Sequence, residues 1–315
     1  MSSFRIRKFT SDDIPQVMVL QRAYQGLYPH AAVIPGEVYL SPGFEDGKNV
    51  FCAFDESGCL QGYAPLFPNL TEDSQIPHTV WAEVKVSPDL AFPRELKDLL
   101  FEQILNRTRE ITQAFPGHDT RLTFQYHPSE TTSIDYVTSR GCSYTESVFR
   151  LMCDLSQEIP VVPTPAQIDI RPWRMESEVE QQPYVQARNE AFPEAPVTLA
   201  DWQSFLSSPA WQGGTTMTAF DGQEIVGSVA VYWDEEISGQ IGRKAGFTEY
   251  IFVRAKWRRR GIAAFMIYQG LMYLKEHGRE AAYLEVKASN QQALDLYYRL
   301  GYQLIDETRL YVLYL

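Results

Sequence analysis

Apolar and polar positions follow the same succession twice along the chain. Each half begins with a short alternating strand before a polar helix start, at residues 4–9 and 168–173. A hairpin follows, then a strand, a long helical stretch, another strand and a helix that ends at a glycine. The paired strands lie at residues 80–86 and 248–253, and at residues 122–126 and 282–286. The repeat indicates two copies of one α/β domain.

Turn residues and glycines mark the same points in both halves. The hairpins turn at residues 56–58 and 221–222. An apolar strand closes each half 14 residues after a glycine, Gly141 in the first half and Gly301 in the second. Strand–helix–strand order predicts parallel pairing in the middle of each sheet, beside the antiparallel hairpin. The expected fold class is therefore α/β, with two tandem domains that each hold a mixed central sheet flanked by helices.

Three prolines fall within residues 156–166, where the first succession has ended and the second has not begun. Each proline lacks a backbone N–H and fixes its own backbone angle, so this stretch is typical of an extended linker. The chain has 315 residues, which is enough for two domains of about 150 residues each. We expect these domains at residues 1–155 and 167–315.

A basic turn and a glycine connect the strand at residues 248–253 to an apolar helix. Gly261 lets backbone N–H groups approach a phosphate, and the helix that follows directs its unpaired amides at the same point. Arg258, Arg259 and Arg260 add positive charge in an otherwise acidic protein. The residues alone fit a pyrophosphate cradle and a solvated basic turn equally well.

A second segment follows the strand at residues 282–286. Asn290 is placed to cap a helix that ends at Gly301. Tyr297 lies seven residues after Asn290, which is two helical turns, so both side chains project from one face of that helix. Taken alone, this tyrosine fits a packing role as well as a chemical one.

Both segments resemble signatures of the GNAT superfamily, the acyl-CoA-dependent N-acyltransferases. Residues 258–263, RRRGIA, match the pattern (Q/R)-x-x-G-x-(G/A), and residues 290–302, NQQALDLYYRLGY, match N-x-x-A-x-x-L-Y-x-x-x-G-(F/Y). The two patterns occur in the order of the family and within residues 167–315. The tandem arrangement, with the intact motif in the second half, also resembles that of the mycothiol synthases.

The resemblance implies that acetyl-CoA is the acyl donor. The strand edge at Phe252 and Val253 would pair with the pantetheine arm, whose amides mimic a strand. Asn290 would hydrogen-bond near the same arm. Backbone amides of one loop would bind the pyrophosphate, namely those of Arg258, Arg259, Arg260, Gly261, Ile262 and Ala263.

The same resemblance implies two catalytic side chains. Tyr297 would be the general acid that protonates the departing thiolate, because an ordinary tyrosine pKa near ~10 keeps its hydroxyl protonated at neutral pH. Glu249 would accept the ammonium proton of the acceptor, directly or through a water, and a solvent-facing carboxylate is the alternative interpretation. The second half holds no cysteine, so a cysteine acyl-enzyme there is excluded. Transfer would be direct, in a ternary complex.

The first half keeps the pattern of the fold without the motif residues. An ungapped alignment places Arg94, beside Pro93, at the position of the cradle glycine. Aligning the glycines that follow the last helices places Glu130 and Val137 at the positions of the capping asparagine and the tyrosine. We expect a degenerate, non-catalytic domain, and backbone amides alone leave a coenzyme site there as an open alternative.

The composition of the chain argues against several classes of partner and cofactor. The chain has 28 Lys and Arg against 40 Asp and Glu, a net charge of −12, which disfavours nucleic acid and anionic membranes. No stretch is long and apolar enough for a membrane span, and the N-terminus lacks the apolar block of a signal peptide. The four cysteines and the scattered histidines show no metal-ligand spacing. We expect a cytoplasmic protein with free thiols and no metal.

The acceptor is the least specified part of the prediction. We expect a small-molecule primary amine, and Glu194 together with the run Asp234-Glu235-Glu236 favours a cationic one unless these residues form a solvated face. Other interpretations stay open: acetylation of a thiol conjugate, an antibiotic or a peptide terminus; an acyl-CoA-binding regulatory module without turnover; and a nucleic-acid-binding module built on Trp257 and the arginines. The sequence specifies neither the acyl chain length nor the oligomeric state.

Overall fold

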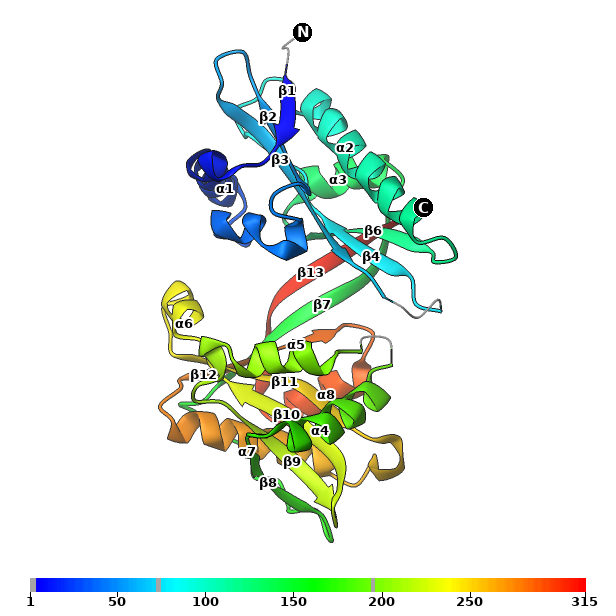
Figure 1. Cartoon of the computed structure of the whole chain (residues 1–315). Helices are drawn as coiled ribbons and strands as arrows, with labels where there is room; N and C mark the ends of the chain where they lie inside the picture. Colours follow the sequence, from blue (N-terminus) through cyan, green and yellow to red (C-terminus); the bar gives the residue numbers. More distant parts are fainter. Residues whose placement is uncertain (1–3, 72–74, 194–195) are drawn as a thin grey trace. The chain divides into compact units, whose positions relative to one another are not determined.

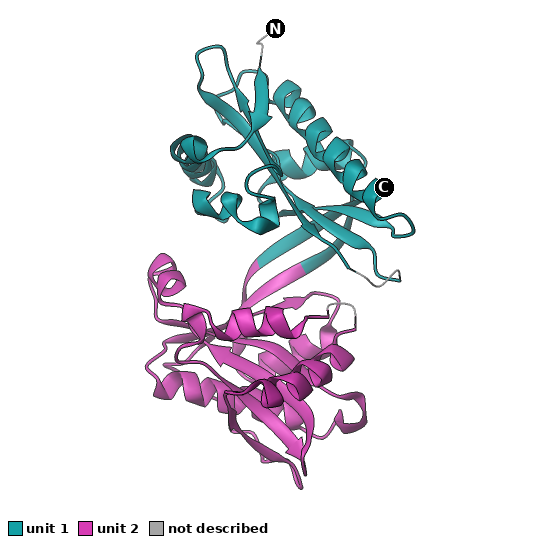
Figure 2. Cartoon of the chain, viewed as in Figure 1, with its two compact units in different colours: residues 1–147, 307–315 teal, residues 148–306 magenta. Residues whose placement is uncertain are grey.

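The chain divides into two compact units in the computed structural model, which describes residues 4–71, 75–193 and 196–315 (Figures 1 and 2). Unit 1 contains Met1–Ser147 and Glu307–Leu315, and unit 2 contains Val148–Asp306. Each unit holds a mixed sheet with helices packed on its faces. The expected α/β fold class is confirmed.

The sheet of unit 1 has the strand order β1–β2–β3–β4–β6–β13–β7, and the short β5 pairs with β3 beside this path. β2 and β3 form the expected antiparallel hairpin, with Gly58 at φ +83° in the turn, and β4 and β6 pair in parallel. The strands that begin in this half are β1 (Arg5–Lys8), β2 (Val50–Phe54), β3 (Leu60–Asn69), β4 (His78–Ala82), β5 (Lys85–Val86), β6 (Thr120–Tyr126) and β7 (Ser143–Asp154).

Helices cover both faces of this sheet. α2 (Pro93–Ala114) and α3 (Thr131–Ser139) bury their apolar side chains in one cluster, around Phe101. α1 (Ile14–Leu27) packs in another cluster through Val17. Short 3-10 turns are η1 (Ser11–Asp13), η2 (Gly36–Leu40) and η3 (Pro42–Phe44).

The sheet of unit 2 has the strand order β7–β12–β11–β10–β9–β8. β9 and β10 form the second expected hairpin, with Gly222 at φ +64° in the turn, and β11 and β12 pair in parallel. The strands of the second half are β8 (Asp169–Trp173), β9 (Thr215–Asp221), β10 (Glu224–Tyr232), β11 (Ala245–Val253), β12 (Ala281–Lys287) and β13 (Tyr302–Tyr314).

Two pairs of helices cover the two faces of this second sheet. Successive side chains of a strand point to opposite faces, so neighbouring residues of one strand pack against different helices. Val229 and Val231 of β10 pack with α7 and α8, whereas Ala230, between them, packs with α4 and α5. The helices are α4 (Glu178–Ala191), α5 (Leu199–Leu206), η4 (Pro209–Trp211), α6 (Glu235–Ile241), η5 (Ala255–Trp257), α7 (Ile262–Glu276) and α8 (Gln291–Arg299). In the described part of the chain, no helix combines the length and the apolarity that crossing a membrane requires.

Each unit receives one strand from the other half of the sequence. Residues Arg309–Tyr314 of β13 pair antiparallel with β6 of unit 1, and residues Val148–Asp154 of β7 pair antiparallel with β12 of unit 2. The expected domains, 1–155 and 167–315, divide the chain by sequence order alone, whereas the compact units exchange these strands.

The proline-rich segment forms neither helix nor strand over residues 158–165. It is nevertheless packed, because Ile159 is buried in the core of unit 2 and Val162 lies partly buried against the same cluster. The segment is therefore fixed to unit 2 along part of its length.

Candidate functional site

Two strands of unit 2 separate and leave an open edge. β11 and β12 pair for only three residues, ending at Phe247↔Tyr283, although both strands continue. Beyond Phe247, β11 keeps β10 on one side and has no strand partner among the described residues on the other. This edge of β11, which includes Phe252 and Val253, is therefore open to pairing with another extended chain.

β11 carries a bulge just beyond the point of separation. Its register against β10 passes from Ala230↔Glu249 to Ser228↔Phe252, so β11 has one residue more than β10 over this interval. Tyr250 lies inside the bulge at φ +50°, a left-handed conformation that is uncommon for a residue other than glycine. A bulge leaves its extra residue outside the hydrogen-bonded ladder. Backbone polar groups thus become available beside the open edge.

The loop after β11 ends at the N-terminus of α7. Gly261 is the N-cap residue of this helix at φ +78°, and a Cβ atom there would meet no atom within 4 Å. Glycine is therefore favoured at this position by the backbone angle and not by crowding. No described residue accepts a hydrogen bond from the backbone N–H groups of residues 261–264. These amides and the positive end of the helix dipole form an anion-binding surface.

The three arginines of this loop are all exposed. Arg258 donates from Nε to the backbone carbonyl of Val253 at 2.9 Å, which ties the loop to the end of β11. Arg259 adopts a left-handed conformation at φ +66°. Arg258 is extended and Gly261 is left-handed, so the backbone changes direction within this loop before α7 begins.

α8 presents the second motif. Asn290 is its N-cap residue, and the side-chain oxygen accepts a hydrogen bond from the Ala293 N–H at 3.2 Å. This bond leaves the side-chain NH₂ group of Asn290 for a ligand. Tyr297 is 7% exposed and packs against Tyr302, and its hydroxyl makes no hydrogen bond to a described residue. Burial raises the pKa of Tyr297 to about 12, so the phenol stays protonated at neutral pH.

A cavity of about 750 Å³ in unit 2 brings these elements together. Its volume is in the range of small-molecule and cofactor sites. Arg260 and Glu249 do not line it. The residues predicted from the sequence that do are Phe252, Val253, Arg258, Arg259, Gly261, Ile262, Ala263, Asn290 and Tyr297.

Glu249 lies outside this cavity wall, on β11 directly before the bulge. Its side chain is half-buried, and the Tyr232 hydroxyl donates a hydrogen bond to Oε2 at 2.7 Å. Burial raises the pKa of Glu249 above its ordinary value and nearby Glu285 acts in the same direction, whereas the Tyr232 hydrogen bond and Arg150 lower it. Glu249 is thus an anchored carboxylate and not a freely solvated one.

Other residues of the cavity were missed by the sequence prediction. Ile251 and Ala264 adjoin predicted residues and could have been inferred from them. Ala191 and Phe192, at the C-terminal end of α4, come from a segment with no motif of its own, so nothing in the sequence connects them to the site. Tyr232, which lies outside the cavity and donates a hydrogen bond to Glu249, also has no sequence signal.

Residues that suggested nucleic-acid binding and a cationic acceptor have structural roles in the protein. Trp257 is 3% exposed and its indole N–H donates to Asp221 at 2.9 Å, so the ring cannot stack on a nucleic-acid base. Asp234 caps α6 by accepting from two backbone N–H groups, and Glu235 pairs with Arg279. The acidic run is thus the start of a helix, and Glu194 lies outside the described residues.

Unit 1 has different residues at the positions that correspond to the motif residues of unit 2. The N-cap residue of α2 is Phe92, so Phe92 and not Arg94 corresponds to the cradle glycine. The ungapped alignment was wrong because the loop before α2 spans residues 87–92, two fewer than residues 254–261 before α7.

The expected placement of Glu130 and Val137 in unit 1 agrees with the elements. Glu130 is the N-cap residue of α3, as Asn290 is of α8, and it is 5% exposed. Its carboxylate accepts from the Tyr24 hydroxyl at 2.7 Å. Val137 is fully buried and offers no hydroxyl. A buried carboxylate therefore replaces the amide that unit 2 presents.

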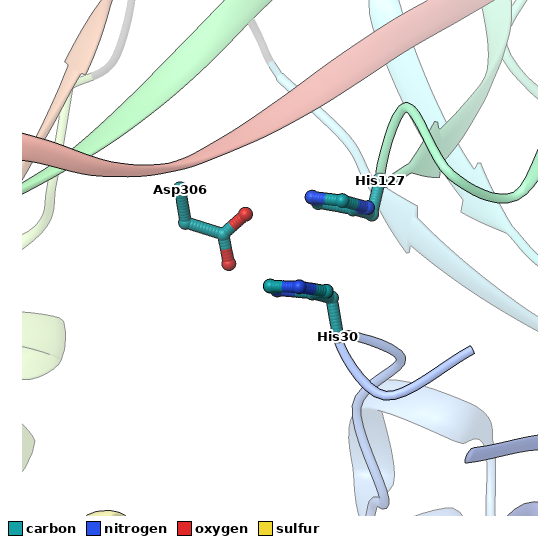
Figure 3. A group of neighbouring side chains, drawn as sticks. All are labelled: His30, His127 and Asp306. Carbon is teal, nitrogen blue, oxygen red and sulfur yellow. The ribbon is translucent and has the colours of Figure 1, made fainter. Parts of the chain in front are cut away.

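Histidines that are scattered in the sequence form two stacked pairs in unit 1. The rings of His30 and His127 lie 4.0 Å apart and nearly parallel (Figure 3). Those of His78 and His118 lie 4.4 Å apart. Both pairs join residues far apart in the sequence, which is why spacing gave no sign of them.

Residues 173–302 match the model of the acetyltransferase (GNAT) family. This segment contains the separated strands, both motifs and every residue that lines the cavity. The GNAT fold implies acyl transfer from acyl-CoA to an acceptor. No curated protein matches the chain.

Solved structures show that the whole chain has a tandem GNAT fold. A GCN5-related N-acetyltransferase from Sphaerobacter thermophilus superposes with a TM-score of 0.76 at 20% identity, over 99% of this chain and 95% of that one. A tandem GNAT protein from the clavulanic acid biosynthesis pathway gives 0.70 at 14% identity, over 99% and 98%. A fungal glucosamine N-acetyltransferase region gives 0.74 at 17% identity, covering 99% of this chain and 38% of that longer chain. None of these three is a mycothiol synthase by its description.

Proposed function

We propose that the protein is an acetyl-CoA-dependent N-acetyltransferase that acts on a primary amine of a small molecule. The observation that carries the proposal is the cavity of about 750 Å³ in unit 2. Two motifs about 30 residues apart line its wall, one with unpaired helix amides and the other with an accessible amide and a phenol. The pyrophosphate would bind at residues 258–263, and the pantetheine arm would pair with Phe252 and Val253.

The reaction then needs two proton transfers. Glu249 accepts a proton from the acceptor ammonium, and the free amine attacks the thioester carbonyl carbon. The new C–N bond forms, the C–S bond breaks, and the Tyr297 hydroxyl protonates the leaving thiolate. The raised pKa of Tyr297 keeps this proton in place until the thiolate departs. The acetyl group passes directly to the amine without a covalent enzyme intermediate.

Calorimetric titration of acetyl-CoA tests the donor site. The variants are Gly261→Ala and Gly261→Pro, with Gly278→Ala as the matched control. Gly278 stands at the opposite end of α7 at φ +72°, and a Cβ atom there also meets nothing within 4 Å. Both alanine variants therefore impose the same backbone strain, of about 1 kcal/mol. We expect one site per chain, about tenfold weaker in Gly261→Ala, lost in Gly261→Pro and unchanged in Gly278→Ala.

Two sites per chain, or one site that survives both Gly261 variants, would show that the donor binds elsewhere. The acceptor is then sought by following thiol release from acetyl-CoA with a panel of primary amines. The panel includes a cysteinyl amino-sugar conjugate, aminoglycosides and peptides with free N-termini. Tight coenzyme binding with no thiol release for any amine would favour a regulatory module over the enzyme.

A further inference from the structure

A tyrosine outside the cavity holds the carboxylate of the proposed base. The Tyr232 hydroxyl donates to Oε2 of Glu249 at 2.7 Å. Tyr232 is opposite Phe247 and Glu249 is opposite Ala230 in the β10–β11 register, so Tyr232 and Glu249 project from the same face of the sheet. No described residue donates a hydrogen bond to Oε1 of Glu249. The tyrosine occupies one carboxylate oxygen and leaves the other to a substrate.

The Tyr232 ring is held in place by its neighbours. It stacks on Phe247 with ring centroids 5.3 Å apart, and the Phe205 ring of α5 meets it edge-on at 5.2 Å. Gly214 lies so close that a Cβ atom there would come within 3.0 Å of the Tyr232 Cβ atom. A hydroxyl on a ring that packs between two other rings, and whose Cβ atom is closely packed, has little freedom to move, which is the requirement for orienting a catalytic group.

The other groups that face Glu249 do not take over this role. Arg150 and Glu285 pair with each other at 2.9 Å, and their charges act on Glu249 in opposite directions. Tyr250 is half-buried beside Glu249 and faces Arg188 of α4. Asp234 lies near Tyr232 and disfavours its ionisation, as does the charge of Glu249. Tyr232 is therefore a permanent donor, and its hydrogen bond is the interaction that favours the ionised carboxylate most directly.

We propose that Tyr232 is a positioning residue of the acetyl transfer: it holds Glu249 ionised and oriented so that Oε1 meets the acceptor ammonium. This proposal rests on the proposed function, because it assigns Tyr232 a role in the same reaction. Tyr232 itself exchanges no proton with the substrate. Its contribution lies in the state of Glu249 before the amine binds.

The test compares Tyr232→Phe with Tyr273→Phe. Tyr273 of α7 also donates one hydrogen bond, to the Gly213 carbonyl at 3.0 Å, so both variants lose one hydroxyl and one hydrogen bond. The pH dependence of kcat/KM is measured with the best amine of the panel. In Tyr232→Phe we expect the ascending limb of the pH profile to move up by about one pH unit, so that kcat/KM is about tenfold lower at pH values below the limb. KM for acetyl-CoA should stay unchanged, and Tyr273→Phe should match the wild type.

A second readout does not depend on turnover. Carbon-13 NMR of carboxyl-labelled glutamate, with the Glu249 signal assigned by its loss in Glu249→Gln, gives the pKa of Glu249 directly. That pKa should be higher in Tyr232→Phe than in the wild type. If Tyr232→Phe fails to bind acetyl-CoA, Phe247→Leu replaces it in the test. This variant keeps the Tyr232 hydroxyl but removes the ring that stacks on Tyr232. The ascending limb of its pH profile should also move to higher pH.

The outcomes separate the two proposals. An active Tyr232→Phe enzyme with an unshifted limb and an unshifted Glu249 pKa overturns the role of Tyr232 and leaves the proposed function intact. An equal shift in Tyr273→Phe overturns it as well, because the effect would then be general. A wild-type protein that acetylates no amine overturns the proposed function itself, and with it the role of Tyr232 in transfer.

Discussion

Tyr297 combines deep burial with a hydroxyl that has no hydrogen-bond partner among the described residues. A phenol that supports the fold only through its ring can lose the hydroxyl at little cost in stability. Tyr297→Phe should therefore lower kcat by about 100-fold or more, the usual contribution of a general acid. The affinity for acetyl-CoA and the melting temperature should stay close to the wild-type values. Steady-state thiol release, calorimetry and thermal unfolding measure the three quantities.

Tyr298→Phe is the matched control for this variant. Tyr298 is the next residue of α8, is 43% exposed and does not line the cavity. Equal kcat losses in both variants would argue against a proton-transfer role for Tyr297. So would a Tyr297→Phe enzyme with wild-type kcat.

Residue identities at the cavity could be predicted because the motif concentrates them in two short segments. The loop residues and the α8 residues each lie within 13 positions of one another in the sequence. Tyr232 could not be predicted, since it reaches Glu249 across two strands and 17 positions of chain. Contacts of this kind depend on the strand register, which is set by the pairing of β10 with β11 and not by a local motif.

At the scale of the element, one side chain serves both the cap of α8 and the proposed coenzyme site. The Asn290 oxygen caps the helix, and its NH₂ group remains available at the cavity where we propose that the coenzyme binds. Asn290→Asp keeps the cap and places a negative charge at the cavity, whereas Asn290→Ala removes the cap. We expect Asn290→Ala to lose about 1 kcal/mol of stability and Asn290→Asp to lose almost none. Urea unfolding measures this difference.

Acetyl-CoA affinity should rank the same two variants in the opposite order. A carboxylate next to a coenzyme that carries phosphates is less favourable than a methyl group, so Asn290→Asp should bind acetyl-CoA more weakly than Asn290→Ala. The position corresponding to Asn290 in unit 1 already carries the carboxylate of Glu130. Equal affinities in both variants would mean that the side chain of residue 290 serves only as the cap.

Elements could be predicted more reliably than their ends and their connections. Hairpins, parallel strands and the helices before Gly141 and Gly301 follow from local patterns of turn residues and apolar spacing. The strand expected at residues 80–86 is interrupted instead, because β4 pairs with β6 while β5 pairs only with β3. The position of Phe92 was missed for a similar reason, since loop lengths between equivalent elements need not be equal.

At the scale of the whole chain, the closing strands have nearly the same pattern in both halves. β7 and β13 each end 13 residues after a glycine and carry similar apolar positions, so the sequence does not show which sheet each strand completes. The structure places Leu151 of β7 in the core of unit 2 and Tyr311 of β13 in the core of unit 1. The division of the chain into folding units is therefore a property of the tertiary structure.

This exchange predicts that core substitutions act on the unit that contains the side chain and not on the half that encodes it. Leu151 is fully buried and Tyr311 is 6% exposed, so Leu151→Ala and Tyr311→Ala should each cost about 3 kcal/mol. Hydrogen exchange followed by mass spectrometry should show faster exchange of α7 and β10 in Leu151→Ala, and of α2 and β6 in Tyr311→Ala. Each variant is the control for the other. If Leu151→Ala loosened α2 and left α7 protected, the strands would belong to the halves that encode them and the exchange would be refuted.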